Sequence, residues 1–263
     1  METHILNRFH YCLILLSWVS ISFSQIPEDM VTIGAGSYVP LYGTSDKKPV
    51  NIKSFLLDIY PVTNQEYLEF LKTNAAYRKS KIKRLFANTT YLSEWNGDLN
   101  FGKLNSNAPV TNVSWFAAKT YCECQGKRLA TLDEWEYVAM ADEKRKDART
   151  REEFNKYILS WYEKNKTYNN SVGKTFKNYW GVYDMHGLVW EWTFDFNSIF
   201  LSGESRKDKD TDKDLFCGSG SVNATDLMNY AAFMRYAFRG SLKAQYSTRN
   251  LGFRCASDKK NKQ

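Results

Sequence analysis

The sequence predicts a mixed α+β fold with much irregular structure. Apolar residues alternate with polar ones at Met30–Ile33 and at 50–58, which is typical of strands with one buried face. Capping boxes that start at Thr63 and Thr131 precede helical apolar patterns. Aromatic residues make up 16% of the chain, which suits loops held in place by large side chains. Strands and helices do not alternate, so a doubly wound fold is not expected.

Local patterns place further elements along the chain. Residues 116–125 favour a helix with Ser114 as its N-cap and Gly126 after its last turn. Residues 142–166 are charged and favour another helix, with apolar residues on its inner face. Two short strands and a polar surface loop are expected at 219–222, 236–241 and 202–214. No repeat or linker divides the chain, so we expect a single domain.

The first 24 residues have the pattern of a secretory signal peptide. A short start containing Arg8 precedes an apolar run at 11–21, and small residues then predict cleavage after Ser24. The apolar run is too short for a membrane span. Residues 25–263 are therefore expected to form an exported domain, periplasmic, secreted or associated with the cell envelope, with no membrane span after cleavage.

The chain carries a formal net charge of +7. Its lysines and arginines stand in short mixed runs with acidic residues, which usually indicates a solvated surface, although an anionic lipid or polysaccharide is an alternative partner. No nucleic-acid motif occurs, and export also argues against that partner. The four cysteines after the signal, Cys122, Cys124, Cys217 and Cys255, favour disulfides in an exported protein, with three connectivities open.

Six sequence blocks, in the correct order, resemble the formylglycine-generating-enzyme family, also called the sulfatase-modifying-factor domain. The blocks are Pro-Val-Thr-Asn at 61–64 and the segments 109–115, 118–122, 126–137, 181–192 and 250–256. The resemblance covers nearly the whole chain after the signal and implies a variant of the C-type-lectin-like fold. The family contains formylglycine-generating oxidases, sulfoxide synthases and exported proteins with no known catalysis.

The resemblance implies that the copper site of the oxidases is missing. Those enzymes hold copper(I) with two cysteines after a glycine- and serine-rich strand, as expected for soft thiolate ligands. Aligning that strand with 219–222 places Ala224 and Asn229 at the cysteine positions, so no catalytic residue is assigned. Trp190 and Ser221 match residues beside the oxygen pocket, but core packing and strand hydrogen bonding explain them better.

The iron site of the sulfoxide synthases is also not expected. It needs three histidines, and His186 is the only histidine after the signal. A single histidine at this position is interpreted as a structural residue of a turn. Neither copper nor iron is therefore expected as a cofactor.

Calcium is the metal that the resemblance does imply. In the family, the motif Tyr-Asp-x-x-Gly-x-x-Trp-Glu-Trp holds one calcium ion. Transferred to this chain, the ligands are the carboxylates of Asp184 and Glu191 and the carbonyl oxygens of Gly187 and Val189. Carboxylates and carbonyls are the oxygen ligands that calcium prefers.

The resemblance also implies a disulfide between Cys122 and Cys255. Cys124 and Cys217 are then left, and the sequence does not decide whether they pair with each other or remain free thiols.

A non-catalytic binding or assembly module, acting in a periplasmic or envelope protein complex, is the function that these observations favour. An exported partner protein would bind the variable segments 79–107 and 202–214. The alternative is an accessory enzyme or maturation factor of altered chemistry that acts on another exported protein. Its cleft would lie near Trp190 and Ser221, and its polar groups would be Asp226, Asn229 and Arg235. Carbohydrate recognition rests on fold-level analogy alone.

Overall fold

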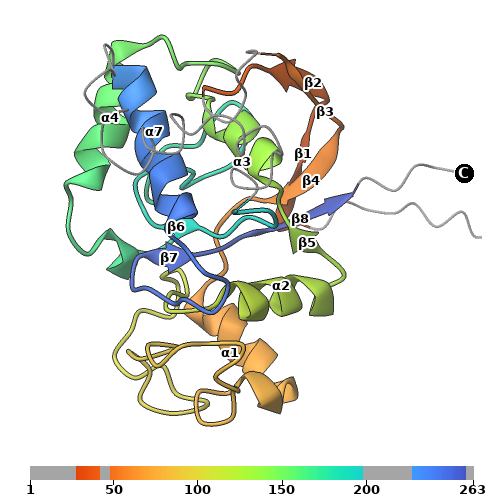
Figure 1. Cartoon of the computed structure of the whole chain (residues 1–263), viewed down its shortest axis with the longest axis vertical. Helices are drawn as coiled ribbons and strands as arrows, with labels where there is room; N and C mark the ends of the chain where they lie inside the picture. Colours follow the sequence, from red (N-terminus) through yellow and green to blue (C-terminus); the bar gives the residue numbers. More distant parts are fainter. Residues whose placement is uncertain (1–27, 42–47, 198–226, 259–263) are drawn as a thin grey trace, which may run out of the picture.

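A computed structural model describes residues 28–41, 48–197 and 227–258, and the structural statements below concern these residues. Figure 1 shows an antiparallel sheet with α3 beside it, α4 and α7 at the far side, and α1 and α2 below. The sheet has the strand order β1 (Met30–Ile33), β4 (Phe55–Asp58), β8 (Cys255–Asp258) and β5 (Arg128–Leu129). The two-stranded sheets are β2 (Gly36–Tyr38) with β3 (Val50–Ile52), and β6 (Trp190–Glu191) with β7 (Leu251–Gly252).

The main sheet joins the two ends of the described chain. Leu57 of β4 lies opposite Val31 of β1 on one side and Ala256 of β8 on the other. The first described strand and the last one therefore share β4 as a neighbour.

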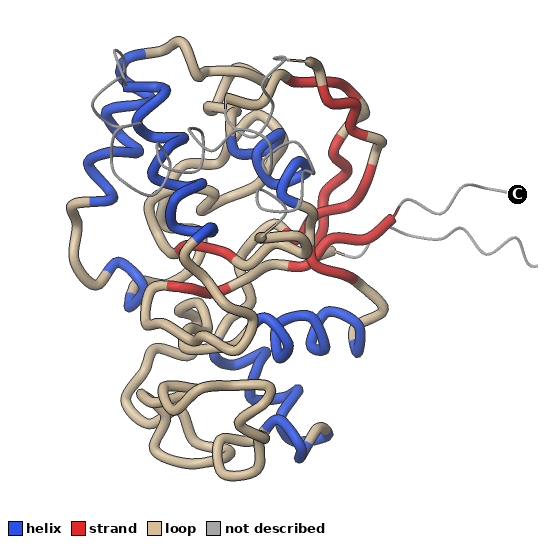
Figure 2. Tube along the Cα trace, viewed as in Figure 1, coloured by secondary structure: helices blue, strands red, loops and turns tan. Residues whose placement is uncertain are grey.

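Five α-helices and two 3₁₀ helices complete the elements of the described residues. They are α1 (Asn64–Thr73), η1 (Ala75–Tyr77), α2 (Trp115–Cys124), α3 (Leu132–Ala139), α4 (Glu152–Tyr162), η2 (Thr167–Asn169) and α7 (Leu227–Gly240). Both predicted capping boxes are present at Thr63 and Thr131, and Ser114 caps α2 as predicted. Long loops fill much of the rest, above all between α1 and α2 (Figure 2). The prediction of a mixed fold with much irregular structure is confirmed.

Two large apolar cores hold these layers together. One contains Tyr67, Trp192 and Phe253, and it joins α1 and α2 to the loops around β6 and β7. The other contains Leu57 and Trp135, and it fills the space between the main sheet and α3. Burial of such large side chains is the dominant favourable contribution to folding.

The strand predicted at 50–58 is in fact two strands. Residues Val50–Ile52 pair with β2, whereas Phe55–Asp58 pair with β1 in the main sheet. The chain bends between them, where the Ser54 hydroxyl donates to the carbonyl of Ile33 at 2.8 Å. An alternating pattern indicates which side chains face the core, but it does not indicate that the chain passes from one sheet to another.

The strand predicted at 236–241 is wrong, because most of this stretch belongs to α7. Its apolar residues alternate locally, but Ala231, Arg235 and Arg239 recur at helical spacing and are buried on one face. The helix expected at 142–166 is confirmed only for Glu152–Tyr162. The signal peptide, the loop at 202–214 and the strand at 219–222 lie outside the described residues. No helix in the described part is long and apolar enough to cross a membrane.

Candidate functional site

The turn from Tyr183 to Trp192 is held by hydrogen bonds to its acidic residue Asp184. This residue has a φ of 60°, and its carboxylate accepts from the backbone N–H of Gly173 at 2.5 Å and from the hydroxyl of Thr175 at 2.8 Å. Gly187 has a φ of 101°, and an added Cβ there would lie 2.4 Å from the hydroxyl oxygen of Tyr157. Glycine is therefore required at this position.

Glu191 forms a buried ion pair with Arg254, which comes from the loop between β7 and β8. The guanidinium donates through Nε to Oε2 at 2.9 Å and through Nη2 to Oε1 at 2.8 Å. Oε2 also accepts from the indole N–H of Trp135 at 2.8 Å. Both carboxylate oxygens are therefore bound by protein groups, in the fork geometry that makes such pairs strong.

This arrangement does not fit the calcium site that the family resemblance implies. A cation at Glu191 would have to displace Arg254, which also donates to the carbonyls of Asp58, Ile59 and Tyr183. The carboxylate of Asp184 is engaged with the segment 173–175 instead. Within the described residues, no three histidine, cysteine, aspartate or glutamate side chains are grouped to hold a metal. Calcium binding stays a prediction.

Trp190 packs between α4 and α7. Its ring stacks on Tyr162, with 4.9 Å between the ring centroids and 20° between the planes, and it lies 4.6 Å from the ring of Phe238. Trp161 lies against it at 5.3 Å. Aromatic packing of this kind gives Trp190 a structural role, as interpreted from the sequence.

Glu136 of α3 forms a second buried ion cluster, with two arginines of α7. Arg235 donates through Nε to Oε1 at 3.0 Å and through Nη2 to Oε2 at 2.9 Å, and Arg239 donates through Nη1 to Oε1 at 2.6 Å. The guanidinium of Arg239 also lies 4.5 Å from the ring centroid of Trp135. Burial alone would raise the pKa of Glu136, but the two arginines hold it at about 2.

His186 lies next to this cluster and is fully enclosed. Its Nε2 contacts the carbonyl oxygen of Ala139 at 2.8 Å, which assigns the proton to Nε2, and its Nδ1 has no hydrogen-bond partner. The rings of Trp135 and Phe154 meet it edge to face. Burial lowers the pKa of His186 to about 3, and the charge of Arg235 acts in the same direction. The imidazole is therefore neutral and held in the core at neutral pH.

Acid is expected to remove the stability that the Glu136 cluster provides. The folded pKa of about 2 lies below the ordinary value of 4.5, so this stability is present above pH 4.5 and is lost as the pH falls towards 2. The shift corresponds to roughly 3 kcal/mol. Glu136→Gln should unfold more easily than wild type at neutral pH, and the difference between the two should shrink through this window. Urea unfolding at a series of pH values measures it.

The exposed carboxyl of Glu69, paired with Lys72, is the matched control. Glu69→Gln should follow the wild-type curve at every pH, because an exposed pair adds little stability. A difference between Glu136→Gln and wild type that stays constant down to the acid limit would contradict the assignment.

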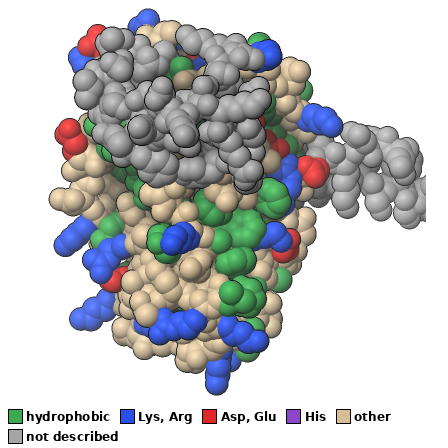
Figure 3. Space-filling view, in the orientation of Figure 1, with side chains coloured by type: hydrophobic (Ala, Val, Ile, Leu, Met, Phe, Trp, Pro, Cys, Tyr) green, Lys and Arg blue, Asp and Glu red, His purple; other side chains and the backbone are tan. Residues whose placement is uncertain are grey.

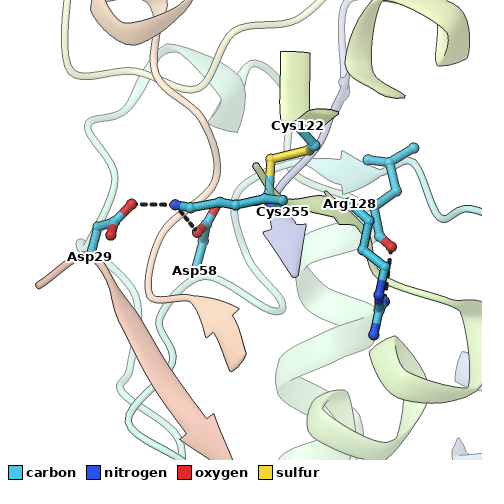
Figure 4. The surroundings of a disulfide bond; sticks show 7 residues. Asp29, Asp58, Cys122, Arg128 and Cys255 are labelled. Carbon is cyan, nitrogen blue, oxygen red and sulfur yellow. Dashed lines mark hydrogen bonds and ion pairs between the residues drawn. A yellow bond between two sulfur atoms is a disulfide. The ribbon is translucent and has the colours of Figure 1, made fainter. Parts of the chain in front are cut away.

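The predicted disulfide between Cys122 and Cys255 is confirmed. Figure 4 shows that it joins α2 to the start of β8, close to Asp58 and Asp29. The Nζ of Lys127 bridges these two carboxylates. Cys124 is an exposed free thiol.

The other predicted positions fall outside what the structure describes, or take part in structural contacts. Ser221, Ala224, Asp226 and Cys217 lie outside the described residues, and Asn229 is described only as part of the backbone of α7. Arg235 is described, but its guanidinium is bound to Glu136.

The Glu136 cluster was missed by the sequence analysis. Arg235 and Arg239 stand one helical turn apart, which is a usable signal once the segment is read as a helix. Because 236–241 was predicted to be a strand, the helical spacing of these two arginines was not considered.

Comparison with known families identifies the class of this scaffold. The family model described as "Sulfatase-modifying factor enzyme 1-like domain" matches residues 21–259, so the chain belongs to this family. Its fold is therefore the formylglycine-generating-enzyme variant of the C-type-lectin-like fold, as predicted.

Relatives of the chain include proteins named as formylglycine-generating enzymes and others named as inactive. "Inactive C-alpha-formylglycine-generating enzyme 2" of Bos taurus is 25% identical, over 90% of this chain and 88% of the relative. "Formylglycine-generating enzyme" of Mus musculus is 26% identical, over 89% of this chain and 74% of the relative. "Serine/threonine-protein kinase pkn1" of Chlamydia pneumoniae is 30% identical over 65% of this chain, which spans only 28% of that kinase. Among solved structures, PvdO from Pseudomonas aeruginosa matches 87% of this chain and 94% of that chain, with a TM-score of 0.49 and 19% identity.

Proposed function

We propose that the chain is a non-catalytic binding or assembly module of an exported protein complex in the periplasm or cell envelope. The observation that carries this proposal is that no cysteine lies between Cys217 and Cys255, the stretch in which the family's oxidases place both copper ligands. Cys255 is bridged to Cys122, so it cannot supply a thiolate either.

The buried acidic side chains of the turn 183–192 and of α3 support this proposal. Glu191, Asp184 and Glu136 each accept several hydrogen bonds from within the protein, and Trp190 is stacked between helices. Groups bound in this way stabilise a scaffold, whereas a reactive site requires a base or nucleophile that can reach a substrate. The similarity to a relative named inactive, along nearly its full length, points in the same direction.

The test combines a catalytic assay with isolation of the native assembly. The purified protein, supplied with copper(I), should form no formylglycine on a sulfatase, whereas the Streptomyces coelicolor formylglycine-generating enzyme serves as the positive control. A tagged copy, expressed at native level and isolated from the envelope fraction in mild detergent, should migrate as a complex with one stoichiometric exported partner. Formylglycine formation by this chain, or isolation of a monomer that carries stoichiometric copper or iron, would contradict the proposal.

A further inference from the structure

A patch of exposed and half-buried apolar side chains lies at the start of α2. We call it the Trp115 patch and define it as Leu85, Phe86, Trp115, Phe116 and Phe194. Leu85 is 72% exposed and Phe194 is 47% exposed, whereas Phe86, Trp115 and Phe116 are half-buried. Apolar side chains that are exposed together, rather than singly, indicate an interaction surface. Figure 3 shows hydrophobic side chains gathered over α2 on this face, with lysine and arginine side chains around them.

Ring contacts connect the patch into one surface. The ring centroids of Phe86 and Phe116 lie 5.4 Å apart, those of Phe116 and Trp115 also 5.4 Å, and those of Trp115 and Phe194 6.2 Å. These residues come from three separate segments of the chain, so the surface is a product of the fold.

Hydrogen bonds hold the patch in place. The indole N–H of Trp115 donates to the carbonyls of Thr193 at 3.0 Å and Phe194 at 3.1 Å, and its backbone N–H donates to the carbonyl of Ala244 at 3.0 Å. The loop that carries Leu85 is tied to the same region, because the N–H of Asn88 donates to the carbonyl of Gln245 at 2.9 Å. These hydrogen bonds fix the positions of the segments that carry the apolar side chains.

Positive charge borders the patch. Lys83 and Arg84 directly precede Leu85, and Lys243 directly precedes Ala244. Within the described part of the chain, none of these three cations forms an ion pair with a carboxylate. Lys243 lies over the ring of Tyr246, 5.9 Å from its centroid, and keeps its charge there. Cations that no carboxylate neutralises, next to exposed apolar side chains, make this surface complementary to an anionic layer with an apolar layer beneath it.

We propose that the Trp115 patch docks this protein onto an anionic lipid membrane as a peripheral protein. The aromatic rings and Leu85 would enter the boundary between headgroups and acyl chains, where tryptophan and other amphipathic aromatic residues are favoured. Lys83, Arg84 and Lys243 would contact the anionic headgroups. This inference goes beyond the proposed function and holds whether or not the chain is catalytic.

A lipid surface explains the patch better than a protein partner does. Leu85 is an exposed aliphatic side chain next to Lys83 and Arg84. Such a side chain can insert into a lipid layer, which needs no preformed pocket. Lys83 and Arg84 stand next to Leu85 in the chain and have no carboxylate partner in the described residues, so an anionic surface is the partner that their charges fit.

Vesicle flotation of the purified protein tests the proposal. The protein should bind vesicles of phosphatidylglycerol mixed with phosphatidylcholine, should bind pure phosphatidylcholine much less, and should release as salt screens the charges. Each cation contributes about fivefold to binding, so Lys83→Gln with Arg84→Gln should weaken it roughly 25-fold. Leu85→Ser with Phe194→Ser should weaken binding about tenfold or more, through lost apolar burial.

Tyr179→Ser is the matched control. Tyr179 is 47% exposed, like Phe194, and lies 5.6 Å from the Nζ of Lys146, but it is outside the patch. This variant should bind vesicles as wild type does, and thermal melting of every variant shows whether it is folded. Three results would overturn the proposal: no binding to anionic vesicles at low salt, equal binding with and without phosphatidylglycerol, or a dimer in solution that the patch substitutions dissociate.

Discussion

Replacing Cys122 and Cys255 together with alanine is expected to lower the free energy of unfolding by on the order of 4–5 kcal/mol. The disulfide spans 133 residues, and such a long loop restricts the unfolded chain strongly. Its sulfurs lie in the buried core between α2 and β8, so its loss also affects the packing of the sheet. Guanidinium unfolding of the variant and the wild type measures the effect.

Two controls separate the crosslink from the change in side chain. Reduced wild-type protein should resemble the double variant, and Cys124→Ala should resemble oxidised wild type because Cys124 is an exposed free thiol. A double variant within 1 kcal/mol of wild type would show that the crosslink contributes far less than chain entropy predicts.

Glu191→Gln is expected to destabilise the fold by about 3–5 kcal/mol, because it leaves the charge of Arg254 buried without a carboxylate. Arg254 cannot turn to solvent, since its remaining N–H groups are bound to the carbonyls of Asp58, Ile59 and Tyr183. Thermal and urea unfolding measure the loss. Glu94→Gln, which breaks the exposed pair with Arg249, should change stability by less than about 1 kcal/mol.

The Glu191→Gln variant also tests the calcium prediction. If Arg254 is the partner of Glu191 in solution, calcium should leave the Tm of wild type unchanged relative to EDTA. A rise in Tm with calcium that disappears in Glu191→Gln would show that the ion replaces the arginine, as the sequence motif predicts.

The sequence predicted local features well, such as helix caps, which depend on residues close together in the chain. The capping boxes at Thr63 and Thr131 depend on hydrogen bonds across three residues, and both helices start where expected. The disulfide was predicted from the family motifs, and the ring contacts of Trp190 agree with its interpretation as a packing residue.

Apart from the disulfide, contacts between residues far apart in the chain were not predicted. Glu136 meets Arg235 and Arg239 across 99 and 103 residues, and no local pattern reports such a contact. The family motif assigned Glu191 to calcium, and its ion pair with Arg254, 63 residues further along the chain, was not predicted. In α7 the local alternation of apolar residues competed with the helical spacing, and tertiary packing against α4 decided the outcome.

The position of β8 has a consequence for how the chain folds during synthesis. It is the last described element to leave the ribosome, yet it is an inner strand with β4 on one side and β5 on the other. Until Cys255–Asp258 has been synthesised, β4 and β5 each lack β8 as a neighbour, and Cys122 lacks its disulfide partner. The main sheet therefore cannot be completed before the last of its strands, β8, has been synthesised. Completion of the sheet depends on a four-residue strand that is synthesised late. A truncation just before Cys255 removes few residues, but it should prevent the whole domain from folding.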